Sequence, residues 1–516
     1  MKFSNNRPVA LVILDGWGFS SDARGNAIAM ARTPNYDEIC RRYPIATLNA
    51  SGTAVGLKDG VAGNAEIGHV NIGAGRVVQT DAVRIANAIA DETFFDNAVL
   101  TAAFEQAARL GGSIHFIGLL SDGDVHSSTE TLYSLLRMAK RSGITQANVH
   151  AILDGRDVPT RTADVYLEAL EIKMADIGLG RIATICGRHF GMDNSDNWER
   201  TARAFTMLVH GEGERASDPV QAVRSSFLRG ITDEFVAPII IEDDAKESSS
   251  TIRTGDLVVF FNHRADTMRQ IVRSIAVPEP GEIASMAKPN VDVVCLTEYD
   301  RSFGLPIAFP PESRSQNLCE IFADLGVHNY RISEADRFAH VTNFFNGGID
   351  GANKNEMHIQ VPQPNRTVDR ESEPEMRSFK IVDALIRSIE SDPSGVFIVN
   401  IPAPGLIAET GNLERTIEAI QYVDTCLGGI VEKIRDADGV ALITSSHGNS
   451  ERMLDDIGGA DRSATKNSVP FHIIDDEMVG IKLRNGGSLR DVGPTLLGIL
   501  GIEQPLSMTG ADLRFT

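Results

Sequence analysis

The sequence contains few cysteines, and they follow no pattern. The five are odd in number and widely spaced: Cys40, Cys186, Cys295, Cys319 and Cys426. No two of them stand in a Cys-x-x-Cys pair, which a cysteine-based zinc site or a disulfide framework would favour. We therefore expect reduced thiols and a cytoplasmic protein.

Long apolar segments and an excess of positive charge are also missing. No apolar run approaches the roughly 18 residues of a membrane-spanning helix. The first run, Val9–Leu14, ends at Asp15, so we expect no secretory signal. The net charge of −21 opposes binding to nucleic acid or to an anionic membrane. An anionic small ligand would need a local group of basic residues.

What the sequence does contain is an alternation of short apolar runs with longer amphipathic segments. Eight runs predict buried strands: Val9–Leu14, Ile114–Leu120, Val149–Leu153, Ile182–Cys186, Leu257–Phe261, Val291–Leu296, Val396–Asn400 and Val440–Thr444. Apolar residues at helical spacing lie between them, as from Ala163 to Met174 and from Leu413 to Ile434. This alternation predicts an α/β fold with mainly parallel sheets.

Two segments break the pattern. The proline-rich stretch Leu305–Asn317 predicts a crossing between domains, and the chain is long enough for two or three of them. The serine cluster Ser248–Ser250 predicts a surface loop.

Charged and polar residues follow six of the predicted strands. They are Asp15, His126, Arg156 with Asp157, Arg188, Arg264 and His447. Parallel sheets bind ligands outside the carboxyl ends of their strands. One such residue alone is more often a helix cap or half of a surface ion pair. Six strand ends together favour a functional cleft.

A glycine-rich stretch, GVAGNAEIGHVNIGAG over Gly60–Gly75, predicts a loop that bends closely around a small ligand. Glu66 and His69 flank its middle, as in a catalytic loop, although His69 can equally be a loop histidine satisfied by hydrogen bonds. At the centre stands Ala65, which has no reactive atom.

The segments LDGWG, GNAEIGHVNIGAGR, SDGDVHS, LDGRD, WER, FFNHRAD, AHVTNFFNGG and SHGN resemble, in order, those of the cofactor-independent phosphoglycerate mutases. The resemblance spans nearly the whole chain. It implies an α/β fold in which an alkaline-phosphatase-like, metal-binding domain is split by an inserted phosphotransferase-like, substrate-binding domain. The first would comprise residues 1–78 and 313–516, and the second residues 79–312.

In that family a serine takes the phosphoryl group from the substrate and returns it to the other hydroxyl of the glycerate. Two divalent ions, often manganese, activate the serine, and arginines hold the anion. The resemblance implies that six residues bind substrate here: His126, Arg156, Asp157, Arg188, Arg264 and Arg337. Arg337 stands at a lysine position.

The chain departs from the family at the positions that carry the chemistry. Ala65 stands at the serine position, and Asn194 and Thr267 replace two arginines of the substrate pocket. Among the expected metal ligands, Asp15 and His447 are kept. The other four are changed: an aspartate to Ser446, an aspartate to Gly405, a histidine to Glu409 and a histidine to Ala464.

These departures lead to a definite expectation. Removing a serine nucleophile costs about 10⁶ in kcat, and Asp15 with His447 are too few ligands for two metal ions. We expect no resident metal pair, although Glu409 can support one weakly bound manganese ion. The expected protein is a degenerate homologue that cannot form phosphoserine. It would bind a small anion, such as a phosphoglycerate or a carboxylate, or a protein partner.

Two alternatives remain open at this point. The first is an enzyme with different chemistry in the surviving arginine and histidine pocket, in which Ser445 or Ser446 serves as a substitute nucleophile. The second is retained interconversion of 2- and 3-phosphoglycerate.

Overall fold

The computed structural model describes residues 7–242, 251–277, 286–311, 316–349, 351–362 and 372–514. The chain forms two compact units. Unit 1 combines Met1–Gln79 with Ser313–Thr516, and unit 2 is the continuous segment Thr80–Glu312. These bounds lie within a residue of the predicted domain limits, while the metal-binding and substrate-binding roles given to the domains stay predictions.

Unit 1 is built on an eight-stranded mixed sheet. Its order is β12 (Glu356–Val361), β11 (Asn329–Glu334), β13 (Val396–Ile401), β1 (Val9–Leu14), β14 (Val440–Thr444), β15 (Val469–Ile474), β2 (Ile45–Asn49) and β16 (Gly487–Ser488). Only β15 runs antiparallel to its two neighbours. The central strand β1 pairs in parallel with β13 and β14, both from the far end of the chain.

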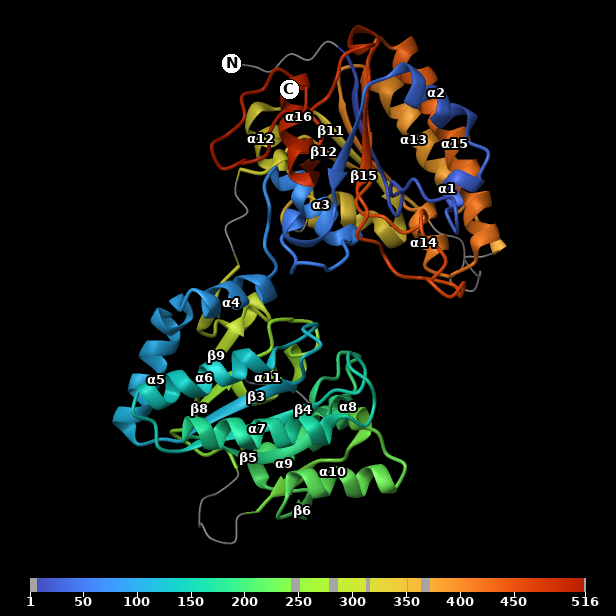
Figure 1. The fold of residues 1–516 in the computed structure, drawn as a ribbon. Coiled ribbons are helices and arrows are strands. Elements are labelled where there is room, and N and C mark those ends of the chain that lie inside the picture. The colour runs from blue at the N-terminus through green and yellow to red at the C-terminus, as the bar shows by residue number, and fades with distance from the viewer. Residues whose placement is uncertain are drawn as a thin grey trace. The chain divides into compact units, whose positions relative to one another are not determined.

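Helices cover both faces of this sheet because β1 is buried on both sides. Ala10, Val12 and Leu14 pack into one core, and the alternate residues Val9, Leu11 and Ile13 pack into the other. The first core is covered by α2 (Pro34–Arg42), α13 (Ser378–Ser391) and α15 (Leu413–Asp436). The second is covered by α3 (Ala65–Ala74), α12 (Leu318–Leu325) and α16 (Val492–Ile499), as Figure 1 shows.

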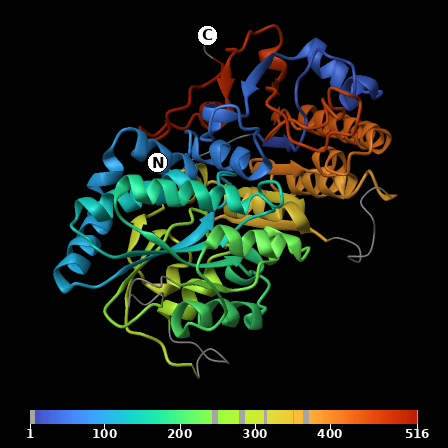
Figure 2. The ribbon, with the colours of Figure 1, turned by 60° about the horizontal axis from the view of Figure 1, so that its bottom comes forward.

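Unit 2 has its own eight-stranded sheet. The order is β10 (Ile307–Phe309), β9 (Asp292–Thr297), β8 (Leu257–Phe260), β3 (Ile114–Leu120), β4 (Ala147–Leu153), β5 (Arg181–Gly187), β7 (Ile239–Ile241) and β6 (Glu214–Ala216). All neighbours are parallel except β5 and β7. Helices such as α6 (Thr129–Arg141) and α7 (Ala163–Ile177) cover one face, and α9 (Trp198–His210) and α11 (Arg269–Ala276) cover the other (Figure 2).

All eight predicted strands are present. Three of them, β1, β3 and β14, have the predicted bounds, and the α/β class with mainly parallel strands is confirmed. The predicted helical stretches are α7 and α15. Within the described ranges, no helix is long and apolar enough to cross a membrane.

The prediction of a loop over Gly60–Gly75 is wrong, because most of that stretch is helix α3. Its N-cap is Asn64, whose side chain accepts a hydrogen bond from the backbone N–H of Ile67. Gly68 lets the helix approach another backbone: a Cβ at this position would lie 2.4 Å from the carbonyl oxygen of Ser446. The glycines therefore permit close packing of a helix rather than bending of a loop.

The two predicted breaks are only partly described. The serine cluster Ser248–Ser250 lies outside the described residues. In the proline-rich crossing, Ile307–Phe309 forms edge strand β10 and residues 312–315 fall outside the described ranges.

Candidate functional site

In unit 1, a buried chain of hydrogen bonds links the carboxyl ends of β1 and β14. The hydroxyl of Ser446 donates to Oδ1 of Asp15, and its oxygen lies 2.9 Å from Nδ1 of His447. The amide of Asn400, in β13, donates to the other Asp15 oxygen at 3.0 Å. Three neighbouring strands therefore fix the Asp15 carboxylate from different sides.

Two further histidines complete this group. His340 has its Nδ1 atom 3.7 Å from Oδ2 of Asp15, and its ring stacks on that of His69 with centroids 5.2 Å apart. Burial alone would raise the pKa of the Asp15 carboxyl, but His340, His69 and His447 together hold this pKa far below its usual range. Burial lowers the pKa of both His69 and His447 to about 4. At neutral pH the site therefore combines the ionised carboxylate of Asp15 with the neutral imidazoles of His69 and His447.

The predicted metal positions do not converge on a set of ligands. Glu409 faces the guanidinium of Arg337, with Oε1 3.3 Å from Nη2. Gly405 and Ala464 have no side-chain donor, and the N–H of Gly405 donates to the backbone oxygen of Asp15. Across the ranges that the structure describes, no three histidine, cysteine, aspartate or glutamate side chains are grouped to hold a metal ion.

The family's pair of divalent ions does not fit this donor set. Each ion needs several anionic or imidazole ligands, whereas both Asp15 oxygens accept hydrogen bonds from Ser446 and Asn400.

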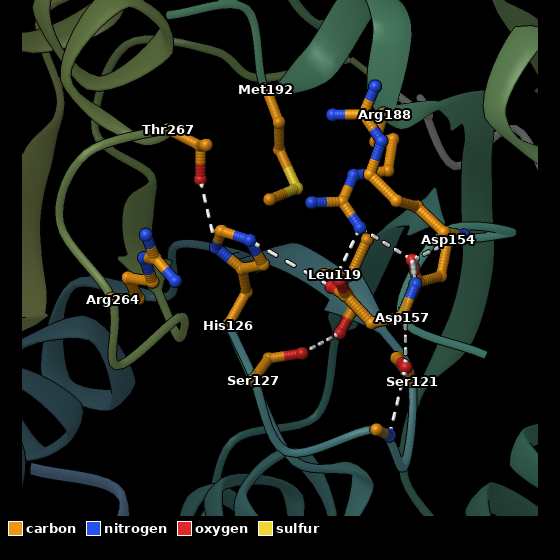
Figure 3. Close-up of polar contacts among 12 residues, drawn as sticks. Leu119, Ser121, His126, Ser127, Asp154, Asp157, Arg188, Met192, Arg264 and Thr267 are labelled. Carbon is orange, nitrogen blue, oxygen red and sulfur yellow. Dashed lines mark hydrogen bonds and ion pairs between the residues drawn. The ribbon is translucent and has the colours of Figure 1, made fainter. Parts of the chain in front are cut away.

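In unit 2, Arg188 is the centre of a second buried group (Figure 3). It follows β5, and its Nη1 atom donates to Oδ1 of Asp154 at 2.6 Å and to Oδ2 of Asp157 at 2.7 Å. Asp154, at the end of β4, also accepts from the hydroxyl of Ser121 and from the backbone N–H groups of residues 156 and 157. Although burial raises the pKa of the Asp154 carboxyl, these hydrogen bonds lower it overall. The guanidinium is thus held in one orientation.

His126 lies between Thr267 and Asp157, as Figure 3 shows. Its Nδ1 atom is 3.2 Å from the Thr267 hydroxyl, and its Nε2 atom is 3.8 Å from Oδ2 of Asp157. Burial, followed by the positive charges of Arg188 and Arg264, lowers the pKa of this imidazole. Thr267, at a position where the resemblance expects arginine, therefore contacts the predicted binding residue His126.

The two remaining arginines of the predicted pocket are more exposed. Arg156 pairs with Glu234 at 3.1 Å, and Arg264 pairs with Asp266 at 2.9 Å. Each of these contacts uses one guanidinium nitrogen, so further N–H groups remain to bind an anion. Asn194, at the other lost arginine position, is exposed. Among the predicted binding residues, His126, Asp157 and Arg188 thus meet at the carboxyl ends of β3, β4 and β5. Arg264, which follows β8, acts on His126 through its charge, and Arg337 belongs to unit 1.

Sequence reasoning missed several residues of both groups. Asp154 lies in the motif LDGRD, and His340 lies in AHVTNFFNGG. Asp154 comes directly after a buried strand, a position from which a site residue could have been predicted. Asn400 is the fifth residue of β13, and the sequence predicted only that it belongs to a strand. Its contact with Asp15 depends on strand pairing, which no local pattern reveals.

Comparisons with known proteins assign the chain that carries these two groups of residues to a family. The model for the "BPG-independent PGAM N-terminus" matches residues 85–301. The 2,3-bisphosphoglycerate-independent phosphoglycerate mutase of Moorella thermoacetica is 43% identical over 99% of both chains. The protein of the same name from Clostridium perfringens strain SM101 is 41% identical over 99% of both. The chain belongs to the 2,3-bisphosphoglycerate-independent phosphoglycerate mutase family.

A solved structure of this family has a similar fold. Phosphoglycerate mutase of Leishmania mexicana, determined at low cobalt concentration, is 29% identical and covers 99% of both chains with a TM-score of 0.71. This match confirms the expected fold class, α/β with an alkaline-phosphatase-like unit. The cobalt in the preparation of that relative weighs against the expected absence of a metal cofactor.

The expectation of a catalytically degenerate homologue is wrong. Relatives at 40–43% identity that cover nearly the whole chain are named as the mutase itself. The error lay in treating each expected position in isolation.

Proposed function

We propose that this protein is an enzyme that interconverts 3-phosphoglycerate and 2-phosphoglycerate. The observation that carries the proposal is the similarity over 99% of both chains to proteins named for this activity. Substrate is a small anion carrying a phosphate and a carboxylate, which matches the arginines gathered in unit 2.

The geometry of unit 2 supports the binding half of this function. Arg188 is held rigidly by Asp154 and Asp157, so its orientation is fixed before ligand binds. Arg264 is 53% exposed in its side chain and can contact an anion with the N–H groups that Asp266 does not use. Guanidinium contacts to phosphate or carboxylate are among the stronger charge-assisted hydrogen bonds.

Unit 1 supports the transfer half. Phosphoryl transfer needs a nucleophile and positive charge or N–H groups to stabilise the transferred group. Ala65 is no nucleophile, but it begins helix α3, and Arg337 lies near His447 on the evidence of their electrostatic interaction. The positive end of the helix and the guanidinium can both stabilise a phosphoryl group.

A coupled assay with enolase tests the proposal. Purified full-length protein is expected to convert 3-phosphoglycerate into 2-phosphoglycerate, and the reverse, at rates well above those of heat-inactivated protein. Arg264→Ala is expected to raise KM roughly 10- to 100-fold, which corresponds to one lost charge-assisted contact.

The matched control is Arg224→Ala. Arg224 is also a half-exposed arginine with a carboxylate partner, Asp164, but it lies within helix α10 (Pro219–Leu228) and does not follow a strand. Its replacement should leave KM unchanged. The absence of any interconversion by well-folded protein, with and without added manganese or cobalt, would show the proposed function to be wrong.

A further inference from the structure

Thr267 contacts the imidazole of His126 from the segment between β8 and α11. Its hydroxyl oxygen lies 3.2 Å from Nδ1 of the imidazole, and both side chains are buried (Figure 3). Within the described ranges, the Thr267 hydroxyl has no other hydrogen-bond partner. This hydroxyl stands where the resemblance expects an arginine.

The segments that follow β3 and β8 are joined by two further hydrogen bonds. The backbone N–H of His263 donates to the carbonyl oxygen of His126 at 2.8 Å. The Nε2 atom of His263 lies 3.2 Å from the carbonyl oxygen of Asp124. Burial lowers the pKa of His263 to about 4, so this ring is neutral at pH 7 and carries its single proton on Nε2, facing an oxygen that can only accept. The backbone of His126 is therefore fixed before any ligand binds.

The other nitrogen of the His126 ring faces a carboxylate. Nε2 is 3.8 Å from Oδ2 of Asp157, and the same oxygen accepts a hydrogen bond from Nη1 of Arg188 at 2.7 Å. Burial, followed by the charge of Arg188, lowers the pKa of His126, so the ring is neutral at pH 7 and has one N–H. A carboxylate that is paired with an arginine only accepts hydrogen bonds, which favours the proton of His126 on Nε2.

These contacts determine the tautomer of His126. With its proton on Nε2, the ring can only accept at Nδ1, and the Thr267 hydroxyl donates its proton there. The opposite tautomer would turn the lone pair of Nε2 toward the carboxylate of Asp157, and the two would repel each other.

The Nε2–H group of His126 is available to a ligand. No hydrogen bond reaches this nitrogen from the described residues, and it is not one of the fully buried polar atoms that lack a partner, so it stays accessible. Arg188 and Arg264 both act on His126 through their charges. A ligand oxygen at Nε2 would therefore lie in the field of two guanidinium groups, which suits a phosphate or a carboxylate.

We propose that Thr267 is a positioning residue for the mutase reaction: its hydroxyl holds His126 in the tautomer whose Nε2–H donates a hydrogen bond to an anionic oxygen of phosphoglycerate. The inference rests on the proposed function and adds a residue to it. His126 would contact the substrate, whereas Thr267 acts only through the imidazole. No covalent bond changes at either residue.

Three variants of the full-length protein test this role. Thr267→Val removes the hydroxyl at nearly constant volume, and Thr267→Ser keeps it. Thr201→Val is the matched control, because Thr201 is a buried threonine of the same unit whose hydroxyl has no hydrogen-bond partner among the described residues. Denaturant unfolding shows whether each variant is folded.

The ¹⁵N chemical shifts of the histidine side chains report the tautomer directly, and the signals of His126 are assigned by their loss in His126→Gln. We expect the Nε2–H form of His126 to dominate at neutral pH in the unchanged protein, in Thr267→Ser and in Thr201→Val. Thr267→Val should contain a mixture of the two forms. A threonine that acted only through packing would leave the tautomer as it is when valine replaces it.

The coupled assay with enolase gives a second measurement. Thr267→Val is expected to raise KM about 10-fold. The value of kcat should change much less, because the weakened contact is already made to bound substrate before the transfer. Thr267→Ser should restore most of the lost affinity, and Thr201→Val should leave KM unchanged.

The outcomes distinguish the inference from the proposed function. Interconversion with an unchanged His126 tautomer, or with an unchanged KM, in folded Thr267→Val would overturn the role of Thr267 and leave the mutase function standing. A dominant Nδ1–H form in the unchanged protein would also overturn this role.

Absence of interconversion by the unchanged protein would remove the mutase function. Calorimetric titration with 3-phosphoglycerate then decides the inference. Tighter binding by the unchanged protein than by Thr267→Val would support the role of Thr267, and equal binding or no binding would overturn it.

Discussion

The guanidinium of Arg337 lies 3.3 Å from the carboxylate of Glu409. The resemblance places a lysine at the first of these positions and a metal-binding histidine at the second, so the two replacements face each other. A partly exposed pair of this kind adds at most about 1 kcal/mol to stability. Its larger effect is on the supply of metal ligands, because the Glu409 carboxylate faces Arg337 instead of serving a cation.

We therefore expect the enzyme to work without its family's two ions. Dialysis against a chelator should leave the interconversion rate unchanged, and elemental analysis of the same sample should find no stoichiometric divalent metal. The reason is that both Asp15 oxygens accept hydrogen bonds from Ser446 and Asn400, and that no three ligands are grouped to hold a metal in the described part of the chain. Loss of turnover on chelation, with recovery on addition of manganese or cobalt, would contradict this expectation.

The second prediction concerns the missing hydroxyl. Ala65→Ser should not produce a phosphoserine at position 65, because a serine hydroxyl needs a base or a metal to become nucleophilic. No metal ligands are grouped around it in the described part of the chain. Acid-stable labelling with 3-phosphoglycerate measures the outcome. An acid-stable label at position 65 would instead show that this hydroxyl is activated without the family's ligands.

The third prediction concerns helix packing at the site. Gly68→Ala should lower the free energy of unfolding by about 1–3 kcal/mol or more, because the new Cβ would meet the Ser446 carbonyl oxygen at 2.4 Å. Chemical denaturation followed by circular dichroism measures the stability.

Gly429→Ala is the matched control for that variant. Gly429 lies inside α15, and a Cβ there has nothing within 4 Å. Alanine should therefore stabilise the protein by roughly 0.5–1 kcal/mol through helix propensity. Equal effects of the two substitutions would show that close approach to Ser446 is not what requires glycine at position 68.

The fourth prediction is a dependence of stability on pH. His472 in β15 is fully buried, and burial lowers its pKa from 6.5 to about 4. Because the unfolded chain takes up a proton at higher pH than the folded one, this contribution is complete above pH 6.5 and is lost as pH falls toward 4. It amounts to about 3 kcal/mol.

His472→Gln should make the decline in stability between these pH values less steep by that amount, measured by denaturant unfolding across the range. His328→Gln, at an exposed site, should leave the profile unchanged. A His472→Gln profile parallel to that of the unchanged protein would mean that this imidazole is protonated as readily in the folded chain as in the unfolded one.

The strands that sequence reasoning found are those buried on both faces. Continuous apolar runs are typical of central parallel strands. Three such runs are Val9–Leu14, Ile114–Leu120 and Val440–Thr444. Strand β11 was missed because its sequence, NYRISE, is polar. Its Arg331 is fully buried, paired with Glu356 of the adjacent β12 at 3.3 Å and stacked over Phe345. Only the folded sheet brings these partners together.

The sequence likewise predicted only part of the candidate site. Residues directly after strands, such as Arg188 and His447, could be proposed from position alone. The contacts that orient them could not, because Ser446 and Asp15 are joined only when β1 and β14 pair. The wrong expectation of inactivity was drawn from single positions such as Ala65, whereas relatives that match nearly the whole chain are named as the mutase.

The pairing of β1 has a consequence for the order in which the protein folds during synthesis. Val9 pairs with Val396 and Val440, so β1, which is made before the other strands described, has no neighbour until β13 (Val396–Ile401) has been made. Unit 2 is continuous and can close its sheet once Glu312 has emerged. The nascent chain must meanwhile keep an unpaired strand of six apolar residues from aggregating. We therefore expect translation that stops between the two units to yield a folded unit 2 with an aggregation-prone N-terminal segment.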